Sequence, residues 1–286
     1  MMVIRKLADF FLDTYIFIAS AGACMVLATY VQLGYTQMPL ALASFVFFST
    51  LLIYNFHKVS SIFKEPFFSP TFFIQQLKKV SFSTLFMMGI SAAGLFVSIL
   101  FIHFRTLLLF LPLGIITYAY AIPLLTVKQK KKRLREIFLA KISTIALVWS
   151  FSTVLVPLTD SGIHPFSRVA LFISIERFLF IFAICVPFEI RDMEQERRWG
   201  NTTLPVMLGE KISIIIGCLA LLIFSILVAV EPTPQPVAAP LHISAVVAAL
   251  LILFSTTQRS QYYFRIFVDG TMQLQLILLL LFRLLS

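Results

Sequence analysis

The run VALFISIERFLFIFAICVPFE (residues 169–189), followed at once by IRDMEQERRWGNTTLPVMLG (residues 190–209), decides the fold of this chain. The first segment is apolar over the length at which a helix crosses a bilayer, about 20 residues. The second segment carries acidic and basic residues in close succession. An apolar segment that ends in a densely charged turn indicates a membrane helix leaving the bilayer at this point.

The composition extends this interpretation to all 286 residues. Hydrophobic residues make up 59% of the chain and charged residues 13%, whereas soluble globular chains are about 45–50% apolar and about 25% charged. A soluble fold has too little interior for so much apolar surface, so lipid must solvate part of it. We expect an all-α, polytopic integral membrane protein that forms a single membrane domain over residues 1–286.

Nine apolar segments are candidates for membrane spans. They lie near residues 10–33, 39–57, 81–103, 106–125, 137–158, 169–189, 211–230, 240–257 and 268–285. The eighth is short, and the ninth begins close to Asp269 and Gly270. Because a carboxylate favours a helix N-terminus, Asp269 is interpreted as the cap of this last helix.

Lys and Arg are distributed very unevenly between the two sides that these spans define. Of the 23 basic residues, Arg105, Arg168 and Arg283 fall on one side, Arg177 lies within a span, and the other nineteen share the side of the N-terminus. The positive-inside rule places that basic face in the cytoplasm and the C-terminus on the opposite side. Topology and attraction to anionic lipid headgroups explain the basicity, so no nucleic-acid partner is expected.

The charged turn after residue 189 is the densest polar cluster. If the helix continues through it, Asp192 and Glu196 lie one turn apart on one face and can share Mg²⁺, which takes phosphate oxygens as further ligands. Glu189 could join that face, and Arg191 and Arg197 carry charge complementary to phosphate. The alternative, a solvated and salt-bridged loop, stays open on physical grounds alone.

The stretch RDMEQERRWGNTTLPVMLG (residues 191–209) resembles the second aspartate-rich motif of the UbiA superfamily of membrane prenyltransferases, a D-x-x-x-D followed by basic residues and a T-L-P-V-x-L-G-like run. Asp192 matches the first acidic position, and Glu196 replaces the second. YAIP (residues 120–123) with KKRLRE (residues 131–136) and Lys141 resembles a second family segment. Nine spans and three large cytoplasmic loops agree with the family fold.

The first aspartate-rich motif departs from the family pattern. In the family it reads N-D-x-x-D-x-x-x-D, whereas the matching stretch here is YNFHKVSS (residues 54–61). Asn55 is retained, but both leading aspartates are absent. His57 and Lys58 are candidates for direct contact with phosphate, and a purely structural role for His57 at the interface is the alternative.

Glu176 and Arg177 are adjacent within the sixth predicted span. Neighbouring residues on a helix point about 100° apart, so we expect each to pair with another span. A structural role in joining helices is favoured, with a substrate role as the alternative.

The resemblance implies a prenyltransferase that moves a prenyl group from a polyprenyl diphosphate to a lipid-soluble acceptor with Mg²⁺. It implies Asp192, Glu196 and Asn55 at the metal and Tyr120 near the allylic cation. The candidates for diphosphate binding are Lys131, Arg133, Lys141, Arg191, Arg197, His57 and Lys58. The rival hypothesis is a degenerate relative that binds an isoprenoid or quinone lipid, or assists assembly, without catalysis. A secondary transporter is disfavoured because no inverted repeat is evident.

Overall fold

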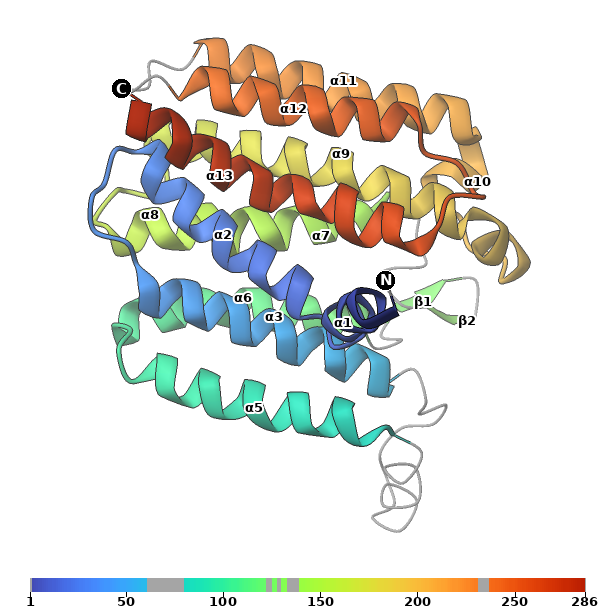
Figure 1. Ribbon diagram of the computed structural model, residues 1–286, viewed down its shortest axis with the longest axis horizontal. Helices are drawn as coiled ribbons and strands as arrows, with labels where there is room; N and C mark the ends of the chain where they lie inside the picture. The colour runs from blue at the N-terminus through green and yellow to red at the C-terminus, as the bar shows by residue number, and fades with distance from the viewer. Residues whose placement is uncertain are drawn as a thin grey trace.

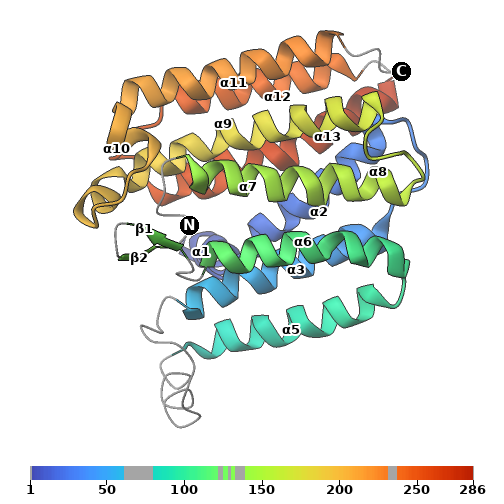
Figure 2. The ribbon, with the colours of Figure 1, turned by 180° about the vertical axis from the view of Figure 1, so that it is seen from behind.

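The structure is a computed structural model and describes residues 2–60, 80–121, 125–127, 130–132, 139–230 and 237–285. Its helices run side by side in one bundle, as Figures 1 and 2 show from opposite sides. The N-terminal half consists of α1 (Met2–Asp13), α2 (Ile16–Gln32), α3 (Leu40–Ser60), α5 (Phe82–Ile99) and α6 (Phe104–Ala121). A short antiparallel hairpin follows, formed by β1 (Leu125–Val127) and β2 (Lys130–Lys132), in which Leu125 pairs with Lys132.

The C-terminal half supplies the remaining helices. They are α7 (Ala140–Ser150), the π-helical turn η2 (Phe151–Leu155), α8 (Val156–Asp160), α9 (Arg168–Arg198), α10 (Leu204–Leu208), α11 (Glu210–Val230), α12 (Ala238–Leu253), the π-helical turn η3 (Tyr263–Val268) and α13 (Asp269–Leu285). The hairpin, α1 and α10 gather at one end of the bundle, and the C-terminus lies at the other (Figures 1 and 2). We call the end with the hairpin the charged end.

The described residues contain six helices long and apolar enough to cross a membrane, and a bent pair, Arg5–Asp13 with Ile16–Gln32, makes a seventh. Two shorter apolar helices, Phe104–Tyr120 and Ala238–Leu253, coincide with the fourth and eighth predicted spans. Large apolar side chains are exposed along the outside of the bundle, for example Phe96 and Leu222. The chain is therefore an all-α, multi-pass membrane protein, while the count of nine spans stays a prediction.

Two details of the predicted helices differ from the structure. The first predicted span, near 10–33, breaks at Thr14 and Tyr15, where α1 and α2 meet with a bend of 68°. Asp269 does not cap the last helix, since η3 runs into α13 and the helical segment Tyr263–Leu285 is continuous. Hydropathy did not predict either feature, because the charged residues beside the break and the join, Asp13 and Arg265, lie within helical segments rather than in loops.

The main core lies where α2, α9, α11, α12 and α13 meet. Phe180 and Phe224 are fully buried there, with ring centroids 5.5 Å apart. Glu176 and Arg177 both contact α2: Glu176 Oε2 accepts a hydrogen bond from Gln32 Nε2 at 3.1 Å, and Arg177 Nη2 donates to Thr29 Oγ1 at 3.3 Å. The prediction that these two residues pair with another span is confirmed.

Candidate functional site

Helix α9 extends well past the predicted span and carries the acidic residues into the charged end. Its last turn ends in a Schellman motif: Gly200 N donates to Arg197 O, and Asn201 N donates to Glu196 O. Gly200 adopts a φ of +72°, which a glycine accepts without steric strain. The predicted continuation of the helix is thus confirmed, and Asn201 folds back towards Glu196.

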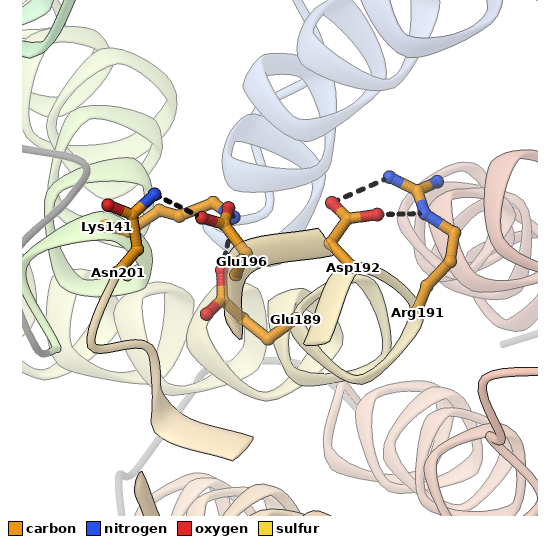
Figure 3. Close-up of polar contacts among 6 residues, drawn as sticks. All are labelled: Lys141, Glu189, Arg191, Asp192, Glu196 and Asn201. Atoms are coloured by element: carbon orange, nitrogen blue, oxygen red, sulfur yellow. Dashed lines mark hydrogen bonds and ion pairs between the residues drawn. The ribbon is translucent and has the colours of Figure 1, made fainter. Parts of the chain in front are cut away.

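Lys141, in the first turn of α7, joins two of the acidic side chains of α9. Its Nζ lies 2.8 Å from Glu189 Oε1 and 2.9 Å from Glu196 Oε1. Asn201 Nδ2 donates to Glu196 Oε2 at 2.7 Å. Figure 3 shows the lysine beside both carboxylates. Since Glu189 is only 2% exposed, the ammonium group compensates a carboxylate that has almost no access to solvent.

Asp192 forms a separate, two-pronged pair with its neighbour Arg191. The Nε–Oδ1 and Nη2–Oδ2 distances are 2.7 and 3.1 Å (Figure 3). The guanidinium also lies over two aromatic rings, 5.1 Å from the centroid of Phe188 and 5.5 Å from that of Phe264. These contacts fix Arg191 between α9 and η3.

These side chains line a cavity of about 680 Å³ at the charged end, here called the charged cavity. Its charged lining residues are Asp13, Lys58, Lys141, Glu189, Arg191, Asp192, Glu196, Arg265 and Asp269. Tyr54 and Lys58 at the end of α3 and the acidic residues of α9 therefore converge on one cavity. Of the predicted site residues, it brings together Asp192, Glu196, Lys141, Arg191 and Lys58.

Asn55 does not line this cavity. It is fully buried, and its Nδ2 donates to Leu51 O at 2.9 Å and to Thr14 O at 3.1 Å. Its amide thus holds the end of α1 against α3. The spacing of the motif could not reveal this arrangement, because the orientation of Asn55 depends on where α1 lies.

His57 and Tyr120 line a second cavity of about 450 Å³ between α3, α6 and α7. Their ring centroids are 6.1 Å apart. Within the described part of the chain, the lining of this second cavity includes no Asp, Glu, Lys or Arg. It borders the charged cavity, since Tyr15, Tyr54, Ile145 and Trp149 line both.

The other predicted phosphate contacts lie elsewhere. Arg197 is more than half exposed and pairs with Glu194 at 3.5 Å rather than facing the charged cavity. Lys131 lies in β2, where it pairs with Thr126 across the hairpin. Arg133 lies outside the described residues.

Sequence reasoning missed three of the acidic and basic residues that line the cavity. Asp13 and Arg265 both line the cavity and form an ion pair at 3.0 Å, and Asp269 lines the cavity from the start of α13. The sequence did carry a signal for Asp269, which lies at the edge of an apolar span. A charged residue is costly there and often indicates a functional site. Because Asp269 was interpreted as a helix cap, it was not included among the candidate site residues.

Mg²⁺ fits this set of residues in part. Asp192 and Glu196 line one cavity, and their carboxylate oxygens are the type of ligand that Mg²⁺ prefers. Both carboxylates are engaged by cations, Asn55 is turned away, and the described residues contain no cluster of three His, Cys, Asp or Glu side chains suited to a metal. Of the three predicted ligands, Asp192 and Glu196 therefore line the charged cavity and Asn55 does not.

The fold and this cavity define a class of protein: a multi-pass helical membrane protein with a cavity lined by ionisable side chains at one end of its bundle. The sequence matches no known family profile and no curated protein. Three solved structures match the fold. A UbiA homologue from Archaeoglobus fulgidus, bound to GPP and Mg²⁺, superposes with a TM-score of 0.62 at 14% identity over 94% of this chain and 98% of that one.

The second similar structure is a digeranylgeranylglyceryl phosphate synthase, with a TM-score of 0.57 at 15% identity over 99% of this chain and 100% of that one. The third is an apo UbiA homologue from Aeropyrum pernix K1, with a TM-score of 0.57 at 14% identity over 94% and 95% of the two chains. The chain has the UbiA fold over nearly its whole length, as the motif resemblance implied.

Proposed function

We propose that this protein is a UbiA-like membrane prenyltransferase, which transfers a prenyl group from a polyprenyl diphosphate to a lipid-soluble acceptor. The observation that carries the proposal is the convergence of the acidic residues of α9 with Lys58, Lys141 and Arg191 on one cavity, within this fold. The uneven distribution of Lys and Arg supports a cytoplasmic position of the charged end as part of this proposal.

The chemistry requires the allylic C–O bond to break, with its electron pair leaving on the diphosphate, and a new bond to form from the acceptor, which then loses a proton. Mg²⁺ held by Asp192 and Glu196 would neutralise charge on the diphosphate when bound. Lys58, Lys141 and Arg191 would bind the phosphate oxygens, where negative charge accumulates during the reaction. Aromatic faces along the cavity wall would stabilise positive charge on the departing carbon.

A second candidate function is the non-catalytic binding of an isoprenoid or quinone lipid, or assistance in assembly. The pairing of Asp192 with Arg191 and of Glu196 with Lys141 favours it, because these carboxylates are already neutralised by the protein. The position of Asn55 outside the charged cavity favours it as well.

Release of diphosphate from prenyl diphosphates of several chain lengths, with purified protein in lipid nanodiscs, separates the two. The proposal expects Mg²⁺-dependent release that Asp192→Asn abolishes and that Glu194→Gln leaves intact, since Glu194 lies on the same helix but is 57% exposed. Full activity of Asp192→Asn would remove the metal assignment. Tight isoprenoid binding without turnover at any chain length would favour the non-catalytic function.

A further inference from the structure

The break between α1 and α2 places a tyrosine in an unfavourable backbone conformation. Tyr15 has φ 63° and ψ 15°, the left-handed region, and the two helix axes bend by 68° around it. For a residue with a Cβ this conformation costs roughly 1–2 kcal/mol. Strained residues persist where surrounding contacts hold them, and they concentrate at ligand sites.

Three consecutive carbonyl groups at the end of α1 supply those contacts. Arg265 of η3 donates to Leu12 O and Lys58 of α3 donates to Asp13 O at 3.2 Å. Asn55 of α3 donates to Thr14 O at 3.1 Å. Donors from two other helices therefore satisfy the helix end that precedes the strained residue.

The ring of Tyr15 lies at the junction of the two cavities. Its centroid is 5.4 Å from that of Tyr54, and the cationic groups of Lys58 and Arg265 lie 5.9 Å from it. Tyr15 and Tyr54 line both the charged cavity and the second cavity. The two tyrosines thus border both a space lined by ionisable side chains and a space whose described lining carries no Asp, Glu, Lys or Arg.

We infer that Tyr15 determines ligand specificity: its ring limits how far the apolar chain of a ligand passes from the charged cavity into the second cavity. This inference rests on the proposed function, which supplies a ligand with an anionic head and an apolar chain. Asn55 acts through Tyr15 as a positioning residue, because its bond to Thr14 O holds the backbone turn that directs the ring. The retained asparagine of the first motif thereby has a role that needs no metal.

Trp149 provides a direct readout, because it lines both cavities and the chain has only two tryptophans. In a Trp199→Phe background it is the sole tryptophan, and its fluorescence reports binding of geranyl and geranylgeranyl S-thiolodiphosphate, which are not turned over. The measured quantity is the ratio of the two dissociation constants, with inorganic diphosphate as the control for the head alone.

Tyr15→Gly keeps the backbone turn, since glycine accepts positive φ, and removes the ring. We expect this variant to change the ratio of the two dissociation constants about tenfold in favour of the geranylgeranyl probe. Asn55→Ala should change the ratio in the same direction. Tyr15→Phe should leave the ratio unchanged. Inorganic diphosphate should bind Tyr15→Gly and the parent alike.

An unchanged ratio in Tyr15→Gly, with the parent binding both probes, would overturn the inference and leave the proposed function standing. A shift in Tyr15→Phe as large as that in Tyr15→Gly would also overturn it, because the ring would then not be the barrier. A parent that binds neither probe would refute the proposed function and this inference with it.

Discussion

Replacing Lys141 with Met tests whether the ion pairs of the charged cavity hold α7 against α9. The change removes the ammonium group that lies 2.8 Å from Glu189 and 2.9 Å from Glu196. Glu196 keeps its bond from Asn201, whereas Glu189, at 2% exposure, loses the cation that compensates it. Removing one partner of a buried pair costs about 3–5 kcal/mol.

Most of this loss in the free energy of unfolding should come from the uncompensated carboxylate of Glu189, so a second substitution at Glu189 should restore stability. Glu189→Gln in the Lys141→Met background removes the uncompensated charge, and we expect it to recover at least about 2 kcal/mol. The assay is equilibrium unfolding of the ligand-free protein in mixed detergent micelles, followed by circular dichroism. Lys211→Met is the matched control, since Lys211 is an exposed lysine in the first turn of α11, and should change stability by less than about 0.5 kcal/mol.

Two outcomes would refute this reasoning. If Lys141→Met unfolds at the same detergent composition as the parent, the lysine does not compensate a buried carboxylate. If the double variant is as unstable as the single one, the loss arises from packing of the lysine stem rather than from charge.

Two further predictions concern α3. Asn55→Asp should lower the free energy of unfolding by about 2–5 kcal/mol, because an ionised carboxylate cannot donate to Leu51 O and Thr14 O. The same unfolding assay measures this loss. A gain in Mg²⁺-dependent turnover would instead support Asn55 as a metal ligand. Gly94→Ala should destabilise the protein by about 1–3 kcal/mol, because its Cβ would lie 2.5 Å from the ring of Phe48. The control Gly89→Ala on the same helix meets no atom within 4 Å, so equal stability of the two variants would contradict the close packing of α3 and α5.

Sequence alone predicted the features that depend on local spacing. The apolar segments predicted the membrane helices, and the charged run after residue 189 predicted that α9 continues with Asp192 and Glu196 one turn apart. The sequence also indicated the UbiA fold through the second aspartate-rich motif, although its identity to the solved structures is only 14–15%. Helix periodicity and motif spacing are properties of consecutive residues, so they can be recognised in the sequence without a structure.

Only the tertiary structure decided which side chains meet. It turned Asn55 towards the end of α1, brought Lys141 between two carboxylates, and added Asp13, Arg265 and Asp269 to the charged cavity. The physical reason is that each of these contacts joins helices distant in sequence, and the direction of a side chain there depends on the packing of a neighbour. The strained turn at Tyr15 belongs to the same class, since donors from two other helices hold it in place.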